Sequence, residues 1–135
     1  MNKYADVALL LLRIGSGSML IANHGFSKLV SAYKYVAHGE SWRFIEGVAG
    51  LGFPAPAFFA ICAALSESIG GALLIVGLLT RYAAAFIAIT MSVAVFRHVS
   101  TDLRYELAAM YLLAAIALML IGAGRFSLDR KLRKA

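Results

Sequence analysis

Two oppositely charged residues stand inside long apolar stretches of this chain. Arg13 interrupts the first apolar stretch, and Glu67 interrupts the second. Counting helical rise from Ala5 and from Pro56 puts these side chains about 12 Å and about 16 Å from opposite faces of a hydrocarbon core about 30 Å thick, at nearly the same depth. Because an unpaired charge at that depth costs roughly 2.5–3.5 kcal/mol, we expect Arg13 and Glu67 to form an ion pair near the bilayer midplane.

This expected pair has a structural and a functional interpretation. It is either a salt bridge that locks two helices together or a carboxylate that handles a proton or a ligand, because ionisable groups inside a membrane often mark pathways. Ser66 and Gly70 flank Glu67 at a spacing of four. Small residues at that spacing let membrane helices approach closely, so the surroundings of the pair favour tight packing.

A second polar set is expected at the outer end of the same helices. From Arg13, His24 and Lys28 continue one stripe of a helix toward that end. The other members lie at the outer ends of two later helices: Arg97, His98, Arg104 and Glu106. They are either interfacial charges that reach headgroups, or the lining of an outward-facing polar pocket under the Trp42 segment. In such a pocket the basic side chains could bind a quinone carbonyl, a carboxylate or an inorganic anion, and a histidine could relay a proton.

The residues required for metal, disulfide, haem or iron–sulfur chemistry are missing or unsuitably spaced in this sequence. His24, His38 and His98 do not have the close spacing of metal ligands, so no metal site is expected; a site made by His24, His98 and Glu106 is the weaker alternative. The single cysteine, Cys62, excludes an internal disulfide relay and thiolate clusters. No haem or iron–sulfur ligand set is present. We therefore expect no intrinsic cofactor, and a quinone is the cofactor that such a protein could bind from outside.

The elements that must position these residues are apolar helices. Hydrophobic residues make up 61% of the 135-residue chain and charged residues 15%, against roughly 45–50% and about 25% in soluble domains. The excess apolar surface predicts a polytopic membrane protein, with one domain over residues 1–135 and lipid as its main partner. Four segments are predicted to be transmembrane helices: residues 5–25, 56–79, 82–97 and 105–122.

The connections between these segments predict their arrangement. The second, third and fourth segments are joined by short links, which make neighbouring helices antiparallel. We therefore expect an all-α four-helix bundle with up-down-up-down topology. The long connection over residues 26–55 carries Trp42 among apolar and charged residues, which predicts a short amphipathic segment in the membrane interface.

The distribution of basic residues predicts the orientation. Five of the last eleven residues are basic, and an even number of spans places Lys3 and Arg81 on the same side as that tail. Because cytoplasmic flanks carry the excess of lysine and arginine, we expect both termini in the cytoplasm. The net charge of +6 does not indicate nucleic-acid binding, since the basic residues are not interleaved with exposed aromatics on a soluble fold.

Several patches, in order, resemble the DoxX family of small bacterial membrane proteins. They are Leu12-Arg13-Ile14-Gly15, His24-Gly25-Phe26-Ser27-Lys28, Gly52-Phe53-Pro54, the core from Glu67-Ser68-Ile69-Gly70-Gly71 to Leu78-Leu79-Thr80-Arg81, and Gly122-Ala123-Gly124-Arg125-Phe126-Ser127-Leu128-Asp129. The resemblance spans nearly the whole chain. It implies four membrane helices, and it maps the recurrent polar positions of the family onto Arg13, His24, Gly25, Lys28 and Glu67.

The resemblance implies function only in outline. Family members look like components of quinone-linked oxidoreductase or detoxification systems, so the leading hypothesis is a membrane component that receives a quinone beside partner redox subunits. Whether such a component is itself catalytic is left open by the residues. The alternatives are a non-enzymatic scaffold or assembly subunit, and a small transporter of anions or weak acids. Four helices are few for alternating access, so the transporter would require a homo-oligomer.

Overall fold

The first helical stretch is longer than its apolar part. The computed structural model describes residues 2–134, and in it α1 (Lys3–Leu20), η1 (Ile21–Gly25) and α2 (Phe26–His38) form one continuous helix of 36 residues. Gly39 ends this helix in the left-handed conformation, with φ 67°. The predicted helix over residues 5–25 is correct in kind but stops well short of the observed end, because the amphipathic residues after it continue as helix.

A π-helical turn, η1, interrupts this long helix. Such turns are rare and are frequent at functional sites, because the extra residue per turn re-aims the side chains that follow. Here the turn includes His24 and ends at Gly25. The backbone of Gly25 lies directly against α4, since a Cβ added at Gly25 would stand 2.6 Å from the backbone oxygen of Glu67.

The other elements are also helices, and the described residues form no strand. They are α3 (Arg43–Ala49), α4 (Pro56–Val76), α5 (Thr80–Thr101), α6 (Glu106–Ile121) and α7 (Leu128–Lys134). Pro56 occupies the first turn of α4, where its missing N–H costs nothing. The third predicted helix was too short at residues 82–97, because α5 begins at Thr80 and continues to Thr101. The short amphipathic segment predicted around Trp42 corresponds to α3.

Three helical stretches are long and apolar enough to cross a membrane: Lys3–His38, Pro56–Val76 and Thr80–Thr101. The fourth, α6, is apolar but has only 16 residues. Large apolar side chains such as Leu11, Phe86 and Leu113 are more than 60% exposed on the outside of the helices. An all-helical membrane protein accounts for this surface, because lipid covers it.

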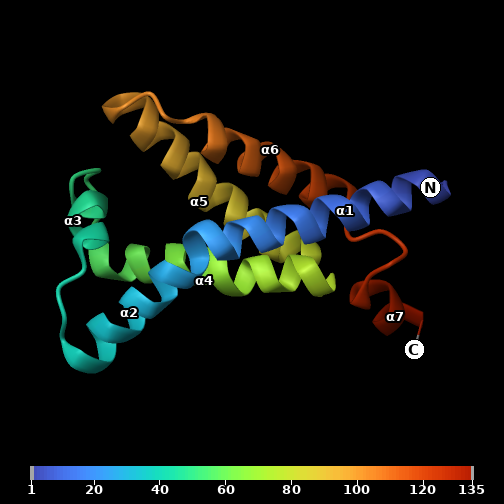
Figure 1. Cartoon of the computed structure of the whole chain (residues 1–135), viewed down its shortest axis with the longest axis horizontal. Coiled ribbons are helices and arrows are strands. Elements are labelled where there is room, and N and C mark those ends of the chain that lie inside the picture. Colours follow the sequence, from blue (N-terminus) through green and yellow to red (C-terminus); the bar gives the residue numbers. More distant parts are fainter. Residues whose placement is uncertain (1, 135) are drawn as a thin grey trace.

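The chain reverses direction between α1 and α4, between α4 and α5, and between α5 and α6 (Figure 1). α4 has the most neighbours, because it contacts α1, η1, α2, α3 and α5, while α5 and α6 form a closely packed hairpin. Both termini and α7 lie at one end of the molecule, called here the terminal end, and α3 lies at the other, called the α3 end (Figure 1).

The centre of the molecule is packed with small and branched residues. Ala60, Ala64 and Ala84 have no exposed surface, and Leu118 has none either. Gly17 approaches α4 so closely that an added Cβ would lie 2.7 Å from the backbone oxygen of Gly71. Small residues thus allow the backbones of α1 and α4 to meet, as is common between membrane helices.

Candidate functional site

A buried ion pair lies near the α3 end. The ammonium nitrogen of Lys28, on α2, is 2.7 Å from both carboxylate oxygens of Glu67, on α4. The side chain of Glu67 is 2% exposed and that of Lys28 is 24% exposed. The ring of Phe44, on α3, lies beneath the same ammonium group, with 4.6 Å from Nζ to the ring centroid. Three helices therefore contribute to one charged contact, which a cation–π interaction supports.

The predicted pair of Arg13 with Glu67 is wrong. Both residues are buried, at 1% exposure each, but the Arg13 guanidinium donates hydrogen bonds to the backbone oxygens of Ala123 and Phe126. Among the described residues, the salt bridge of Glu67 is made with Lys28. Arg13 therefore fastens the segment after α6 to α1 and takes no part in the charged contact at the α3 end.

The register of α1 against α4 explains this difference. Gly17 faces Gly71, and the Arg13 guanidinium lies against Gly77. A Cβ added at Gly77 would be 2.7 Å from a guanidinium nitrogen. Arg13 is thus level with the end of α4, and Glu67 lies about 15 Å of helical rise farther along. The expected pairing places the membrane entry of the first helix at Ala5. In the structure α1 begins beside the C-terminal segment and reaches the end of α4 only at Arg13.

His24 and Tyr111 pack against each other beside the ion pair. The His24 ring meets the Tyr111 ring edge to face, with 6.1 Å between centroids. The ionisable groups close to His24 include Glu67, Lys28 and His98. Tyr111 is 6% exposed, and its hydroxyl has no hydrogen-bond partner among the described residues. The Tyr111 hydroxyl is thus a buried donor that no described residue engages.

α3 covers this end of the molecule. Gly47 of α3 lies against the guanidinium of Arg97, so closely that an added Cβ would be 2.9 Å from one of its nitrogens. Trp42, which precedes α3, packs against Phe44 with 5.5 Å between ring centroids and 39° between ring planes. We call the assembled group the α3-end cluster; its members are His24, Lys28, Phe44, Glu67, Arg97 and Tyr111.

Three residues predicted for the outer pocket lie at the margin of the α3-end cluster or outside it. The ring of His98 is partly exposed, and its Nδ1 is 3.0 Å from the carboxylate of Asp102 on the surface. The N–H of Arg104 and this imidazole hold the pKa of Asp102 below its usual range. Arg104 and Glu106 are exposed. Arg104 lies in the loop between α5 and α6, and Glu106 is the first residue of α6.

Two members of the cluster were missed in the sequence. Tyr111 stands in the middle of an apolar helix rather than near its end, and a hydroxyl at that depth is a signal that could have selected it. Phe44 gave no such signal, because its neighbours in the sequence are equally consistent with an interfacial segment. Only the packing of α3 against α4 places this ring under Lys28.

Comparison with known proteins gives two matches. A family model described as DoxX matches residues 8–99, which contain every member of the α3-end cluster except Tyr111. An uncharacterized protein of Haemophilus influenzae is 33% identical over 125 residues, which cover 81% of this chain and 90% of that protein. No solved structure matches the chain.

Proposed function

The chain belongs to the DoxX family of membrane proteins, and we propose that it is the membrane component of a quinone-linked redox system, with the quinone head group bound at the α3-end cluster. The observation that carries this proposal is the Tyr111 hydroxyl. It is buried, has no partner among the described residues, and lies next to the ring of His24. A buried hydroxyl without a partner costs about 1–3 kcal/mol, which a bound acceptor would recover.

The chemistry of a quinone suits the groups in this cluster. Its two carbonyl oxygens accept hydrogen bonds, and its ring is flat and apolar. Tyr111 supplies a donor for one carbonyl, His24 can donate or accept a proton beside it, and Lys28 supplies a second donor. The rings of Phe44 and Tyr111 offer apolar contacts. Electrons would come from the cofactor of a partner redox subunit, while the residues of this chain bind and orient the quinone.

The proposed setting is the inner membrane of a bacterium. In it, α1, α4, α5 and α6 cross the bilayer in alternating directions, with the terminal end in the cytoplasm. Support comes from the reversal of chain direction at each connection (Figure 1) and from the basic tail after α6. The α3-end cluster then lies toward the outer leaflet, and α3 lies across its interface.

The single tryptophan provides a direct test of quinone binding. Trp42 packs against Phe44, which lies beneath Lys28, so a quinone in the cluster should quench the fluorescence of Trp42. The protein in lipid nanodiscs is titrated with short-chain ubiquinone and menaquinone analogues. We expect saturable quenching, which Tyr111→Phe weakens about tenfold, because a lost hydrogen bond of about 1.4 kcal/mol corresponds to that factor.

A matched control and two further outcomes make the test decisive. Tyr82→Phe removes an exposed hydroxyl at the terminal end and should leave quenching unchanged. Absence of saturable quenching in the wild type would overturn the proposal. Movement of small anions across liposomes by such a protein would then identify the transporter, and loss of a partner enzyme's activity without either effect would identify a scaffold.

A further inference from the structure

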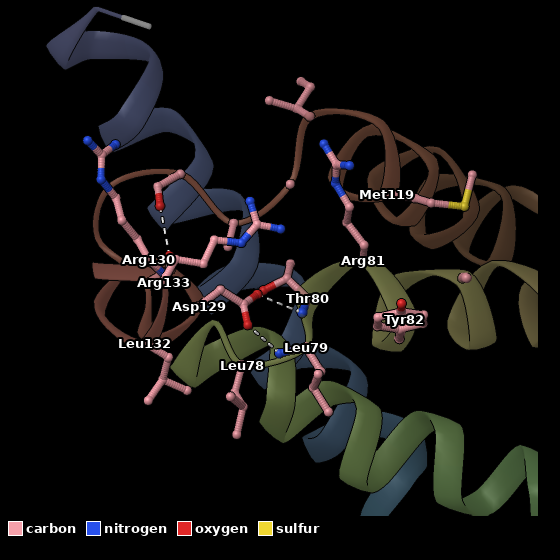
Figure 2. Close-up of a pocket in the computed structure, with 16 residues that line it drawn as sticks. Leu78, Leu79, Thr80, Arg81, Tyr82, Met119, Asp129, Arg130, Leu132 and Arg133 are labelled. Atoms are coloured by element: carbon pink, nitrogen blue, oxygen red, sulfur yellow. Dashed lines mark hydrogen bonds between the residues drawn. The ribbon is translucent and has the colours of Figure 1, made fainter. Parts of the chain in front are cut away.

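A cleft of about 1060 Å³ lies at the terminal end, opposite the α3-end cluster (Figure 2). Its lining comes from the start of α5, the segment that follows α6, and α7. The proposed quinone site makes no use of this cleft. Its residues must therefore be considered for a separate role.

Asp129 holds the wall of the cleft in place. Its carboxylate accepts hydrogen bonds from the backbone N–H groups of Leu79, at 2.7 Å, and Thr80, at 2.9 Å. Figure 2 shows both contacts, which join α7 to the first turn of α5. Because these two donors hold the carboxylate, Asp129 fixes α7 against the start of α5.

Three arginines give the cleft a positive charge. Arg81 rises from α5 on one side, and Arg130 and Arg133 come from α7 on the other (Figure 2). All three are exposed, and none forms a salt bridge with a carboxylate among the side chains described for residues 2–133. Arg81 is oriented by a hydrogen bond of 3.3 Å to the backbone oxygen of Leu120. The cleft thus presents guanidinium groups from two sides to any anion that enters.

Apolar side chains border the same space. Leu79, Tyr82 and Leu132 are each more than half exposed and line the cleft. α5 has 22 residues, which corresponds to about 33 Å and so to the thickness of the hydrocarbon core. Arg81 and Tyr82, near its start, therefore stand at the boundary between hydrocarbon and headgroups, where tyrosine is enriched.

We propose that this cleft binds an anionic phospholipid, with the phosphate between Arg81 and the arginines of α7 and the acyl chains along the apolar border. Guanidinium groups match phosphate oxygens in charge and in hydrogen-bond geometry. The exposed leucines and Tyr82 favour a lipid over free phosphate, because free phosphate would leave them uncovered. This proposal does not rest on quinone binding at the opposite end.

Native mass spectrometry of the full chain in detergent tests the proposal. The protein is mixed with equal amounts of phosphatidylglycerol and phosphatidylcholine, and the lipid that remains bound is identified. We expect the wild type to retain phosphatidylglycerol selectively. Arg130→Gln with Arg133→Gln should weaken that binding about 25-fold, since each basic group near a lipid surface contributes about fivefold.

A control variant distinguishes binding in the cleft from the general attraction between a basic protein and an anionic lipid. Lys34→Gln with Arg43→Gln removes the same charge from exposed positions near the α3 end and should leave selective binding unchanged. An equal loss in both variants, or no selectivity in the wild type, would overturn the proposal. Binding of inorganic phosphate alone, without selectivity for the lipid, would overturn it as well.

The variant on α7 is chosen so that the fold survives. The side chains of Arg130 and Arg133 make no hydrogen bond with the described residues, whereas Arg81 makes one to Leu120. Melting of the variant followed by circular dichroism should match the wild type. Arg81→Gln then serves as the second variant, and it should weaken lipid binding from the other side of the cleft.

Discussion

Among single residues, Glu67 combines deep burial with a charge that needs a partner. Its side chain is 2% exposed, and Lys28 supplies a counterion at hydrogen-bond distance from both oxygens. A buried pair of this kind contributes little net stability, but removing one partner is costly, because the other charge stays in a medium of low polarity. The pair therefore fixes where α2 meets α4, and with it the position of the α3-end cluster.

Glu67→Gln is expected to lower the free energy of unfolding by about 3 kcal/mol, at the lower end of the range for broken buried pairs because Lys28 is partly exposed. Thermal melting in detergent, followed by circular dichroism, measures the change. Glu106→Gln makes the same chemical change at an exposed residue and should have little effect. Equal melting temperatures for the two variants would contradict a structural role for the pair.

The sequence located the buried charges but not their partners. Arg13 and Glu67 are recognisable in their apolar stretches, because an unpaired charge inside a membrane is costly and must have a partner. Their pairing depends on the register between α1 and α4, and the sequence contains no marker of the residue at which α1 begins to pass α4. Arg13 therefore donates to backbone oxygens of the C-terminal segment. Lys28 occupies the position beside Glu67 that was predicted for Arg13.

At the scale of the elements, the contact of the first helix with α4 depends on glycine. A Cβ at Gly25 would stand 2.6 Å from the backbone oxygen of Glu67, whereas a Cβ at Gly15 would meet nothing within 4 Å. Backbone cannot move aside as a flexible side chain can. The two glycines, ten residues apart in one continuous helix, thus form a matched pair for a test of this packing.

Gly25→Ala is expected to destabilise the protein by about 1–3 kcal/mol, because the helices must separate to accept the methyl group. Gly15→Ala should be neutral or stabilising by up to about 1 kcal/mol, since alanine favours helix over glycine. Melting temperatures of both variants in the same detergent measure the difference. A larger loss for Gly15→Ala would show that the close approach at η1 does not determine stability.

The helices themselves were predicted to different degrees. The segments at 56–79 and 105–122 are apolar except for one glutamate in each, and the observed α4 and α6 lie within them. Residues 26–38 mix charged and apolar side chains, so they resembled an interfacial segment, although they extend the first helix. The π turn at Ile21–Gly25 has no sequence signal, because it arises where Gly25 must fit against α4.

α7 is attached to α5 by a contact that should respond to pH. Burial alone would raise the pKa of Asp129, but hydrogen bonds from Thr80 and Leu79 and the charge of Arg133 together outweigh burial and lower it. A lowered carboxyl pKa means that the stabilisation is complete above the unfolded value of about 3.9. It is lost as the pH falls through the lower value of the folded protein.

Asp129→Ala is expected to cost about 1 kcal/mol near pH 7, the usual effect of losing a helix cap, and less as the pH falls below about 4. Asp129→Asn keeps an acceptor that does not titrate, so its contribution should not vary over this range. Melting of the full chain between pH 2.5 and 6 distinguishes the three proteins. Parallel pH profiles for the wild type and the alanine variant would contradict the assignment.

At the scale of the whole molecule, the two ends differ in the way that they hold charge. At the α3 end the ion pair of Lys28 with Glu67 is largely buried beneath α3, and the Tyr111 hydroxyl lacks a partner among the described residues. At the terminal end the arginines are exposed around an open cleft. This asymmetry suits a protein that places a small ligand near one membrane face and contacts anionic lipid at the other.

The proposed orientation predicts which end can be labelled from outside the cell. In a variant with Cys62→Ser, which removes the only cysteine, Ser41→Cys reports on the α3 end and Lys131→Cys on the terminal end. A membrane-impermeant maleimide should label Ser41→Cys in intact cells and Lys131→Cys only after lysis, because the bilayer separates the two ends. Labelling of Lys131→Cys alone in intact cells would reverse the orientation, and labelling of both would contradict the transmembrane arrangement itself.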